Sequence, residues 1–479
     1  MAEVAKFRFQ GVAGLGLSLI LGRLSQALAF VLLARFLSAQ EMGQVAIFTA
    51  LFIGLFQLTN LGFDRYIVFA KVADGEELDL TIDSVWSLQL VRGAIMLLLS
   101  IPIYFALLLF PQLGVSLAEV TAIAAILCLF SIATPELSSF ERKGDFSFVS
   151  RAKGAGLVLG AITTIALVLM WQSPWVYLIG QMVNGAAFAS LSFLYSSRVP
   201  RVRFKRAEIS KVWDYSRHLI LISVVSFLSM QAQNIYVGAM FGSAVLGMYF
   251  TWHRLVNLPG EFVTQIQDKL LFAKASDDSR ADKDSGLVHL VGFALTVALL
   301  LPFYLYVWFH GDVLMTILAT DRWVPFWWVG KMFVLIALLF NIAGTMSPLL
   351  LVKVPHITSK LRFFEAALGL ALIVTLGGYY AIAGVLAALL IEISIAVIAR
   401  IFLLYRYVVT IDRAFHAKTA LMIVTVTCAP IILWELIARA FIAQTYFAYL
   451  SAPVFGLWAV VLGLMVFRAR NRIRARLAQ

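Results

Sequence analysis

The sequence predicts an all-α, polytopic membrane protein with fourteen transmembrane helices, and three observations support this fold class. Of the 479 residues, 62% are hydrophobic and only 13% are charged, whereas soluble proteins are roughly half apolar and about a quarter charged. Apolar runs long enough to span a bilayer, which takes about 20 residues, recur along nearly the whole chain. The connections between them alternate between strongly basic and nearly uncharged segments.

Each apolar run is interpreted as one spanning helix. The first run follows Lys6 and Arg8, as in a signal peptide, but it is too long and no cleavage motif follows it, so we expect it to be retained. Cys128 and Cys428 both fall inside runs, where packing is their expected role. The predicted spans are 11–36, 44–64, 84–110, 117–140, 152–171, 175–197, 218–241, 245–268, 286–309, 324–350, 359–378, 382–405, 417–438 and 446–467.

The basic residues of the connections set the orientation. Arg35, Arg322 and Arg439 are the only Lys or Arg residues in the alternate connections assigned to the outside. The opposite connections hold most of the others, including the segment RVPRVRFKRAEISKVWDYSR (198–217) and the tail RARNRIRAR. Such sorting follows the positive-inside rule, so both termini are predicted to be cytoplasmic. Attraction to anionic lipids explains the basic segments, and no nucleic-acid partner is expected.

The chain is predicted to divide into two six-helix lobes around a central cavity, plus two C-terminal helices. Residues 1–197 form the N-terminal lobe, and residues 218–408 form the C-terminal lobe. Residues 198–217 interleave apolar and basic side chains, which predicts a cytoplasmic amphipathic linker on the membrane surface. Residues 409–479 hold the two extra spans and a basic tail. The segments ARFLSAQEMGQ and GAMFGSAVLGM share a short turn that ends in Gly43 and Gly247, as parallel repeats would.

Charged side chains inside the predicted spans are the strongest functional signal. A charge at the bilayer centre costs at least a few kcal/mol, so it usually faces a bundle interior or a wet cavity. Glu136, Glu365 and Glu435 lie near span ends and are expected to form internal pairs. The remaining deep ionisable residues are Arg23, Arg92, His253, Arg254, Glu261, Lys331 and Glu392.

Three arginines are the candidate ligands for an anion. Arg23 lies about 18 Å along its helix, at 1.5 Å per residue, and should point into a polar interior. Arg254 precedes Pro259, which can kink the helix and free backbone carbonyls. Arg92 lies about two turns from its helix start, so it either faces the cavity or snorkels to the headgroups. Guanidinium offers forked donors that match phosphate oxygens, which predicts a phosphate-bearing substrate.

Neutral polar side chains accompany these charges. Gln26 lies one turn from Arg23, Asn184 lies in span six, and Gln233 and Asn234 lie in span seven. Amides at such depth either join helices or bind hydroxyl-rich ligands, and both interpretations stay open. With His253 and Lys331 they are the predicted glycan-facing lining.

The sequence resembles the polysaccharide or lipid-linked oligosaccharide flippases of the multidrug/oligosaccharidyl-lipid/polysaccharide (MOP) exporter superfamily. The resemblance rests on LGRLSQALAFVLLARFLSAQEMGQVAIFTA, on FERKGDFSF and on GAMFGSAVLGMYFTWHRLVNLP. It implies that an undecaprenyl-diphosphate-linked oligosaccharide is moved from the cytoplasmic to the periplasmic leaflet by alternating access, for exopolysaccharide, capsule or O-antigen synthesis. Arg23 and Arg254 match arginines that such members use for the diphosphate.

The resemblance also implies partners and raises the question of ion coupling. A polysaccharide polymerase and export machinery are implied partners, with membrane lipids. No cofactor or metal is expected, and the coupling ion, Na⁺ or H⁺, is open. Relatives often carry an acid in span seven where this chain has Gln233 and Asn234. Glu261 and Glu392 are the candidate acids that could compete for the arginines and so help release.

Three other classes of protein fit the sequence less well. A cation-coupled drug exporter of the same superfamily typically needs a carboxylate in the first span, which here has Arg23 and no acid. A membrane-embedded glycan polymerase, ligase or acyltransferase usually needs catalytic groups on a long external loop. The longest outward loop predicted, HGDVLMTILATDRWV, holds His310, Asp312 and Asp321 without a recognisable catalytic set. A structural scaffold does not account for deep arginines, so a transporter rather than an enzyme is expected.

Overall fold

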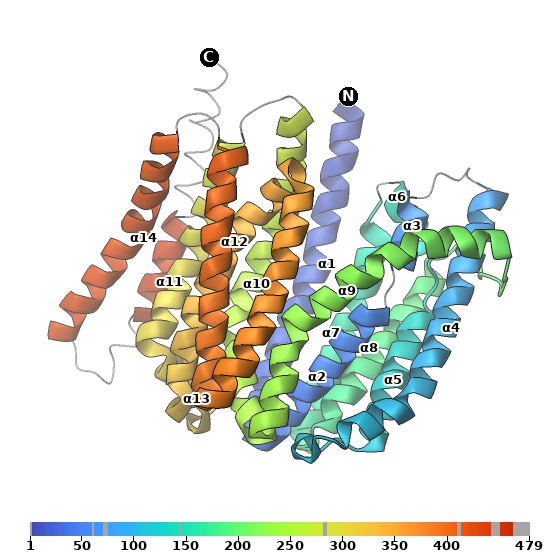
Figure 1. Cartoon of the computed structure of the whole chain (residues 1–479), viewed down its shortest axis with the longest axis horizontal. Coiled ribbons are helices and arrows are strands. Elements are labelled where there is room, and N and C mark those ends of the chain that lie inside the picture. Colours follow the sequence, from blue (N-terminus) through green and yellow to red (C-terminus); the bar gives the residue numbers. More distant parts are fainter. Residues whose placement is uncertain are drawn as a thin grey trace. The chain divides into compact units, whose positions relative to one another are not determined.

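The computed structural model describes residues 2–59, 62–69, 75–143, 145–280, 285–409, 413–441 and 451–462. Within these ranges the regular elements are all helical. The chain divides into two compact units, Met1–Phe250 and Thr251–Gln479 (Figure 1). The division into lobes joined by residues 198–217 stays a prediction.

The first unit holds the helices of the first seven predicted spans. Helix α7 packs on α1 and α8, α5 packs on α4 and α8, and α2 packs on α9. The elements are α1 (Ala2–Phe36), α2 (Ala39–Thr59), α3 (Phe63–Phe69), α4 (Glu76–Leu107), η1 (Pro111–Leu113), α5 (Leu117–Ile132), α6 (Leu137–Arg142), α7 (Ser147–Met170), α8 (Trp175–Leu194) and α9 (Arg206–Phe241).

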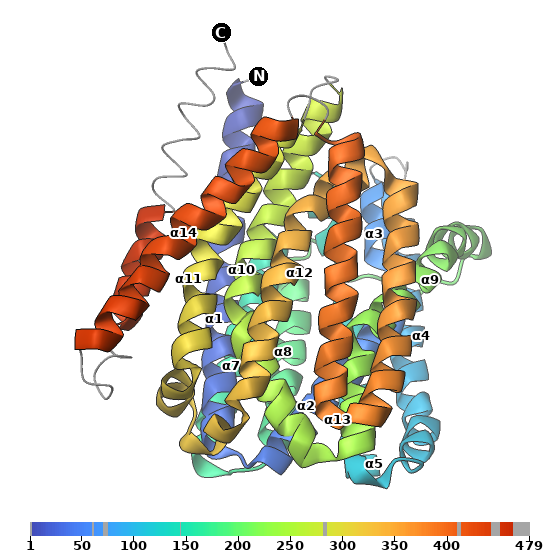
Figure 2. The ribbon, with the colours of Figure 1, turned by 60° about the vertical axis from the view of Figure 1, so that its left-hand side comes forward.

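The second unit takes in most of α10 and the helices that follow it. Helix α12 packs on α11 and on α13, and α11 also packs on α14 (Figure 2). The elements are α10 (Ser243–Arg280), α11 (Gly286–Leu318), η2 (Asp321–Phe326), α12 (Trp327–Lys353), α13 (Pro355–Tyr407) and α14 (Arg413–Phe441), followed by an apolar helix over Ser451–Leu462. The predicted span 446–467 therefore lies only partly within the described residues.

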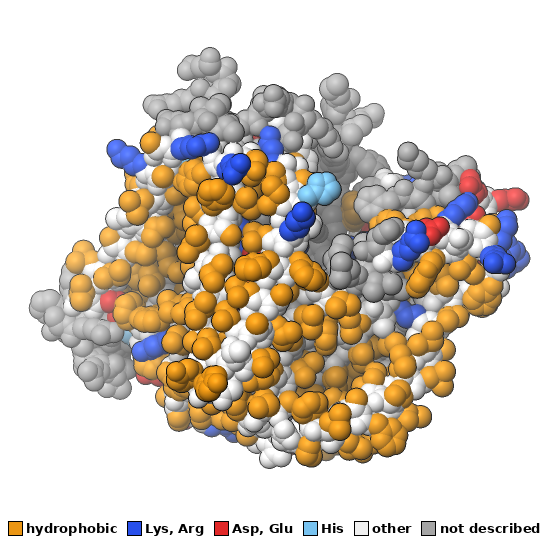
Figure 3. Space-filling view, viewed as in Figure 1, with side chains coloured by type: hydrophobic (Ala, Val, Ile, Leu, Met, Phe, Trp, Pro, Cys, Tyr) orange, Lys and Arg blue, Asp and Glu red, His pale blue; other side chains and the backbone are white. Residues whose placement is uncertain are grey.

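Each of the fourteen predicted spans overlaps a helix in the part of the chain that the structure describes. Eight described helices are long and apolar enough to cross a membrane. One of them, α13, loses helical geometry at Tyr380 and Ala381, so it is two helices joined end to end, as the spans 359–378 and 382–405 predict. Large hydrophobic side chains are exposed along the helices, for example Leu98 at 72% and Leu421 at 69%. In each unit, most Lys and Arg side chains visible in Figure 3 gather toward one end of the helices, and hydrophobic side chains cover their length.

Several predicted boundaries differ from the ends of the helices, and two of these differences change an expectation. The span 117–140 ends at Ile132, because Pro135 has no N–H to continue the helix and restricts the residue before it. Glu136 therefore lies between α5 and α6, where its carboxylate accepts hydrogen bonds from the hydroxyls of Ser196 and Ser197. The outward loop predicted after residue 309 is also mostly helix, since α11 continues to Leu318.

Reciprocal glycine contacts join the two repeated turns within the first unit. A Cβ added to Gly43 would lie 1.8 Å from the carbonyl oxygen of Ser243, and one added to Gly247 would lie 1.9 Å from that of Ala39. Gly43 and Gly247 occupy matching places in the two repeated segments, and so do Ala39 and Ser243. Each glycine therefore packs against the residue that matches its own neighbour in the other repeat. Such a symmetric contact is expected for parallel repeats related by one axis.

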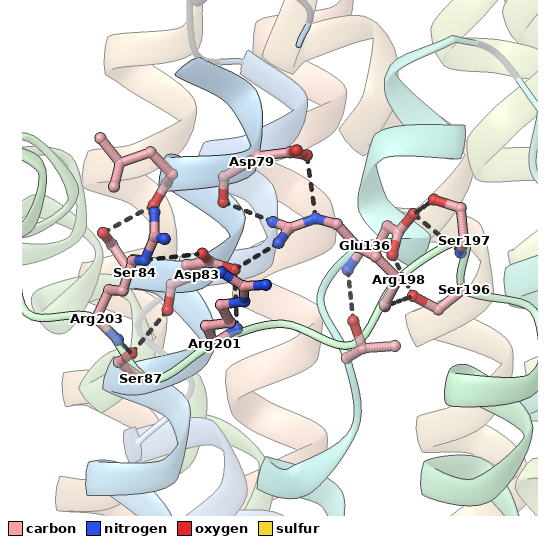
Figure 4. A network of polar contacts seen from close by, with 12 residues as sticks. Asp79, Asp83, Ser84, Ser87, Glu136, Ser196, Ser197, Arg198, Arg201 and Arg203 are labelled. Carbon is pink, nitrogen blue, oxygen red and sulfur yellow. Dashed lines mark hydrogen bonds and ion pairs between the residues drawn. The ribbon is translucent and has the colours of Figure 1, made fainter. Parts of the chain in front are cut away.

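The segment 198–217 is helical only from Arg206, and its first part is bound to α4 (Figure 4). The Asp83 carboxylate, 2% exposed, lies 2.9 Å from Arg198 Nη1 and 3.6 Å from Arg203 Nε. It also accepts the backbone N–H of Arg201 at 3.0 Å, and Ser87 Oγ accepts that of Arg203 at 2.8 Å. These contacts, with those of Arg198 to Asp79, are here called the Asp83 clasp.

Replacing the turn glycines should destabilise the protein. A methyl group at Gly247 or Gly43 must displace backbone, and overpacking of this kind costs about 1–3 kcal/mol. We expect Gly247→Ala and Gly43→Ala to lower the midpoint of thermal unfolding of the detergent-solubilised protein. Gly456→Ala is the control, because no atom lies within 4 Å of its added Cβ. Equal midpoints for Gly247→Ala and the control would contradict the contact.

Neutralising Asp83 should release the segment it holds. Asp83→Asn removes the charge that binds two arginines, and hydrogen bonds to charged groups contribute about 1.5–3 kcal/mol. We expect backbone amides of residues 198–205 to exchange with deuterium at least about tenfold faster, since 1.4 kcal/mol is a factor of ten. Asp214→Asn is the control, because Asp214 pairs with Arg217 on the surface, with both side chains more than half exposed. Unchanged exchange in Asp83→Asn would show that the clasp does not hold the segment.

Candidate functional site

In the first unit, Arg23 lies on the face of α1 that turns away from exposed leucines. Leu21, Leu24 and Leu28 are each more than half exposed. At 100° per residue, Arg23 and Gln26 fall on the other side of the helix, which continues into buried Phe30 and Ala34. Both Arg23 and Gln26 are half-buried. The burial pattern is therefore that of a helix whose polar side chains point inward.

Arg92 reaches sideways within the unit. Its Nη2 and Nε donate to Ser131 Oγ of α5 at 2.9 and 3.3 Å. The Ser131 hydroxyl in turn donates a hydrogen bond to the Leu127 carbonyl at 2.8 Å. The guanidinium carbon also lies 5.9 Å from the ring centre of Phe56 on α2. These contacts hold the guanidinium against α5 and α2, and its orientation toward a cavity or toward the headgroups stays a prediction.

The predicted amides of the first unit are bound to neighbouring side chains. Asn184 is buried against α7, where a Cβ on Gly156 would lie 2.8 Å from its Oδ1. Gln233 accepts a hydrogen bond from the Tyr249 hydroxyl at 2.7 Å. Asn234 donates to Gln231 at 3.4 Å, and its buried Oδ1 has no hydrogen-bond partner among the described residues. Asn184 thus fills the contact between α7 and α8, and Asn234 Oδ1 is an acceptor without a partner in the described ranges.

In the second unit, Arg254 forms an ion pair with Glu261 on the same helix. Arg254 Nη1 and Glu261 Oε1 are 2.5 Å apart, and the two side chains are 30% and 34% exposed. The residues are seven positions apart, about two turns, with Pro259 between them. Buried Trp252, Leu255 and Val256 mark the opposite face, which packs into the unit. The pair therefore lies on the side of α10 that is turned away from the core of its unit.

His253 and Lys331, the other basic residues singled out in the second unit, meet aromatic rings. The His253 ring meets Phe333 edge to face, with centroids 5.0 Å apart. Lys331 Nζ lies 3.9 Å from the ring centre of Trp327 and 5.8 Å from that of Trp308. Cation–π attraction of this kind holds an ammonium group without a carboxylate.

The predicted acids are of two kinds, partly exposed and buried. Glu261 and Glu392 are partly exposed: Glu261 contacts Arg254, and Glu392 lies near Gly369, on the other half of α13. Glu365 forms a bidentate pair with Arg400, both buried, and Arg400 also donates to Ser347 at 3.3 Å. Glu435 lies 2.7 Å from His310. Glu365 and Glu435 are thus internal pairs, as expected from their places near span ends.

Several polar clusters were missed by the sequence reasoning. They are the Asp83 clasp, the pair of His310 with Glu435, and a contact between His289 and His416. A signal existed for the last two, because His289 and Glu435 lie inside predicted spans, where a buried ionisable side chain needs a partner. Within the described ranges, no three His, Cys, Asp or Glu side chains converge as a metal site.

The structure brings Arg254 and Glu261 together, with His253 beside Arg254 in the chain. Arg23 and Arg92 belong to the first unit and Arg254 to the second. The convergence of these arginines on one substrate stays a prediction.

Comparison with solved structures identifies the fold. The chain is similar to a lipid II flippase, MurJ, in an inward closed conformation, with a TM-score of 0.71 at 16% identity, covering 97% of this chain and 100% of that one. It is also similar to an inward-facing multidrug resistance MATE family transporter of the MOP superfamily, with a TM-score of 0.64 at 12% identity, covering 80% of this chain and 94% of that one. No curated protein matches the sequence.

A family model described as polysaccharide biosynthesis protein matches residues 32–327, more than half of the chain. The chain therefore belongs to this polysaccharide biosynthesis family and has the fold of the membrane transporters of the MOP superfamily, not that of an enzyme.

Proposed function

We propose that the protein flips an undecaprenyl-diphosphate-linked oligosaccharide repeat unit from the cytoplasmic to the periplasmic leaflet of a bacterial inner membrane. The product serves exopolysaccharide, capsule or O-antigen synthesis, with a polysaccharide polymerase and export machinery as downstream partners. Both termini are cytoplasmic in this proposal. The family and the likeness to a lipid II flippase support it.

The observation that carries the proposal is the partly exposed ion pair of Arg254 and Glu261. A pair with both side chains about one third exposed can exchange its acid for another anion, because water or ligand already reaches both groups. A diphosphate offers the oxygens that a guanidinium fork prefers. Buried pairs such as Glu365 with Arg400 lack this access.

In the proposed cycle, the diphosphate docks on Arg254 and Arg23, with Arg92 nearby, and displaces Glu261 from Arg254. Gln26, Asn184, Gln233, Asn234, His253 and Lys331 were the predicted glycan contacts. Of these, Asn234 has a buried acceptor with no hydrogen-bond partner in the described part of the chain, which suits a sugar hydroxyl. Glu261 returns to Arg254 on release, and Glu392 has the same proposed role toward another cation. Substrate binding shifts the equilibrium between the inward-facing and outward-facing states only if the substrate binds one state more tightly than the other.

A cation-coupled drug exporter is the second candidate, because MATE transporters share the fold. One assay separates the two. Proteoliposomes carry undecaprenyl-diphosphate-linked N-acetylglucosamine on the inner leaflet, and an external galactosyltransferase labels each molecule that reaches the outer leaflet. Protein-dependent labelling supports the flippase. Absent labelling, together with protein-dependent export of a cationic dye such as rhodamine 6G, would identify the exporter.

Replacing Arg254 by lysine should slow flipping. The substitution keeps the charge and removes the bidentate donor geometry. We expect the labelling rate to fall about tenfold, the equivalent of one charge-assisted hydrogen bond. Arg406→Lys is the matched control, because Arg406 is exposed at the end of α13. An unaltered rate in Arg254→Lys would exclude bidentate recognition at this residue.

Replacing Glu261 by glutamine should strengthen binding and slow turnover. The amide no longer competes for Arg254, so the guanidinium is more available to phosphate. We expect undecaprenyl diphosphate to bind several-fold tighter, measured by native mass spectrometry, while the labelling rate falls. Glu41→Gln is the control, because Glu41 bonds only within its helix cap among the contacts described. Weaker binding in Glu261→Gln would show that the acid supports the site rather than competes for it.

A further inference from the structure

Two histidine contacts fasten α14 to α11 at opposite ends of their interface. His289 and His416 meet near the start of each helix, and His310 and Glu435 meet near the far ends. All four side chains are buried. Between the two contacts the seam is apolar, with Phe293, Val297 and Leu301 packed on Ile423, Val424 and Cys428. None of these histidines belongs to the proposed substrate site.

The first contact is part of a chain of hydrogen-bonding groups from four helices. Thr345 Oγ1 of α12 lies 3.3 Å from His289 Nε2, and His289 Nδ1 lies 3.2 Å from His416 Nε2. His416 Nδ1 lies 3.1 Å from the Tyr405 hydroxyl of α13. The His289 ring also stacks on Phe293, with centroids 5.9 Å apart. On α14 itself, Arg413 lies one turn before His416 and donates its Nε–H to the Val409 carbonyl at 3.3 Å.

The direction of each hydrogen bond follows from Thr345, at one end of this hydrogen-bond chain. The Thr345 hydroxyl donates to the Ile342 carbonyl at 2.7 Å, so toward His289 it accepts, and His289 Nε2 carries the hydrogen. In neutral His289 the other nitrogen, Nδ1, is then an acceptor, and His416 Nε2–H donates to it. Neutral His416 in turn accepts at Nδ1 from the Tyr405 hydroxyl. With both rings neutral, every bond in this chain has one donor and one acceptor.

The same chain accepts one additional proton without losing a bond. A proton added at His416 Nδ1 donates to the Tyr405 oxygen, and the tyrosine hydrogen rotates outward, which half-buried Tyr405 allows. Transfer of His416 Nε2–H to His289 Nδ1 moves the charge from α14 to α11 with no atom displaced far. A second proton would place two cations about 3 Å apart, which like-charge repulsion disfavours.

We propose that His289 and His416 form a single-proton binding site at the α11–α14 seam, which a proton reaches through Tyr405. With the added charge on His416, only the bond to Tyr405 changes its donor direction, whereas with the charge on His289 the bond between the two rings reverses as well. In the orientation proposed above, α11 and α14 both begin on the cytoplasmic side, so the site responds to protons of that compartment. A link between this proton and transport rests on the proposed function, whereas the site itself does not.

Site-resolved titration tests the proposal. The full-length protein, labelled with ¹⁵N-histidine and placed in lipid nanodiscs, is followed by imidazole ¹⁵N shifts from about pH 8 to about pH 5, the range in which histidine usually changes charge. We expect His289 and His416 to change together and to take up one proton between them. Two neutral rings throughout the range, or two fully protonated rings, would overturn the proposal.

His416→Gln provides the decisive variant. Glutamine can accept from Tyr405 and donate to His289, so it keeps the bonds of the neutral chain but cannot be protonated. We expect His289 to stay neutral in this variant, with an unchanged unfolding midpoint. His356→Gln is the control, since His356 is exposed on α13, and the shared titration of His289 and His416 should persist in it. If His289 titrated in His416→Gln as it does in the unmodified protein, the proposal that the two histidines share one proton would be overturned. The measurement needs no substrate, so its outcome is independent of the flippase assignment.

Discussion

Hydrocarbon offers no partner to a charge, so each ionisable side chain in a spanning helix must find one inside the protein. Arg400 forms an ion pair with Glu365, Arg92 donates hydrogen bonds to Ser131, and Lys331 lies against the face of Trp327. These contacts differ in how much water or ligand can reach them. The pair of Arg254 and Glu261 keeps about a third of each side chain exposed, whereas Glu365 and Arg400 are buried. Exposure therefore separates an ion pair that can exchange partners from one that fixes packing.

Close helix packing in the first unit depends on small residues. Without a hydrophobic force between helices in lipid, association relies on close contact of backbones. Gly156, Gly160 and Gly180 provide this contact between α7 and α8, and a Cβ at any of them would lie under 3.0 Å from a neighbouring atom. Asn184 fills the same seam, because Gly156 and Gly160 both face it. Its depth in the membrane thus has a packing explanation that does not need a ligand.

The spans could be predicted because length and hydropathy are local properties of the chain. The face of Arg23 was also accessible, since the exposed leucines at 21, 24 and 28 mark the other side by spacing alone. Pairing could not be predicted in this way. Asp83 and Arg198 are far apart in the sequence, and their contact depends on which helices become neighbours. The early end of α5 had a local signal, Pro135, whose effect outweighs the apolar composition around it.

Helix α14 is an integral part of the second unit rather than an appended anchor. A lipid anchor would need only an apolar surface, yet α14 presents His416 and Glu435 to α11 at the two ends of a continuous apolar seam. Each buried polar group would carry a desolvation cost of about 1–3 kcal/mol if it lost its partner. Sliding of α14 along α11 would separate both contacts at once, while the apolar seam between them would tolerate the movement. The polar ends therefore fix the register of the two helices, and the direction of the hydrogen-bond chain at His289 depends on that register being kept.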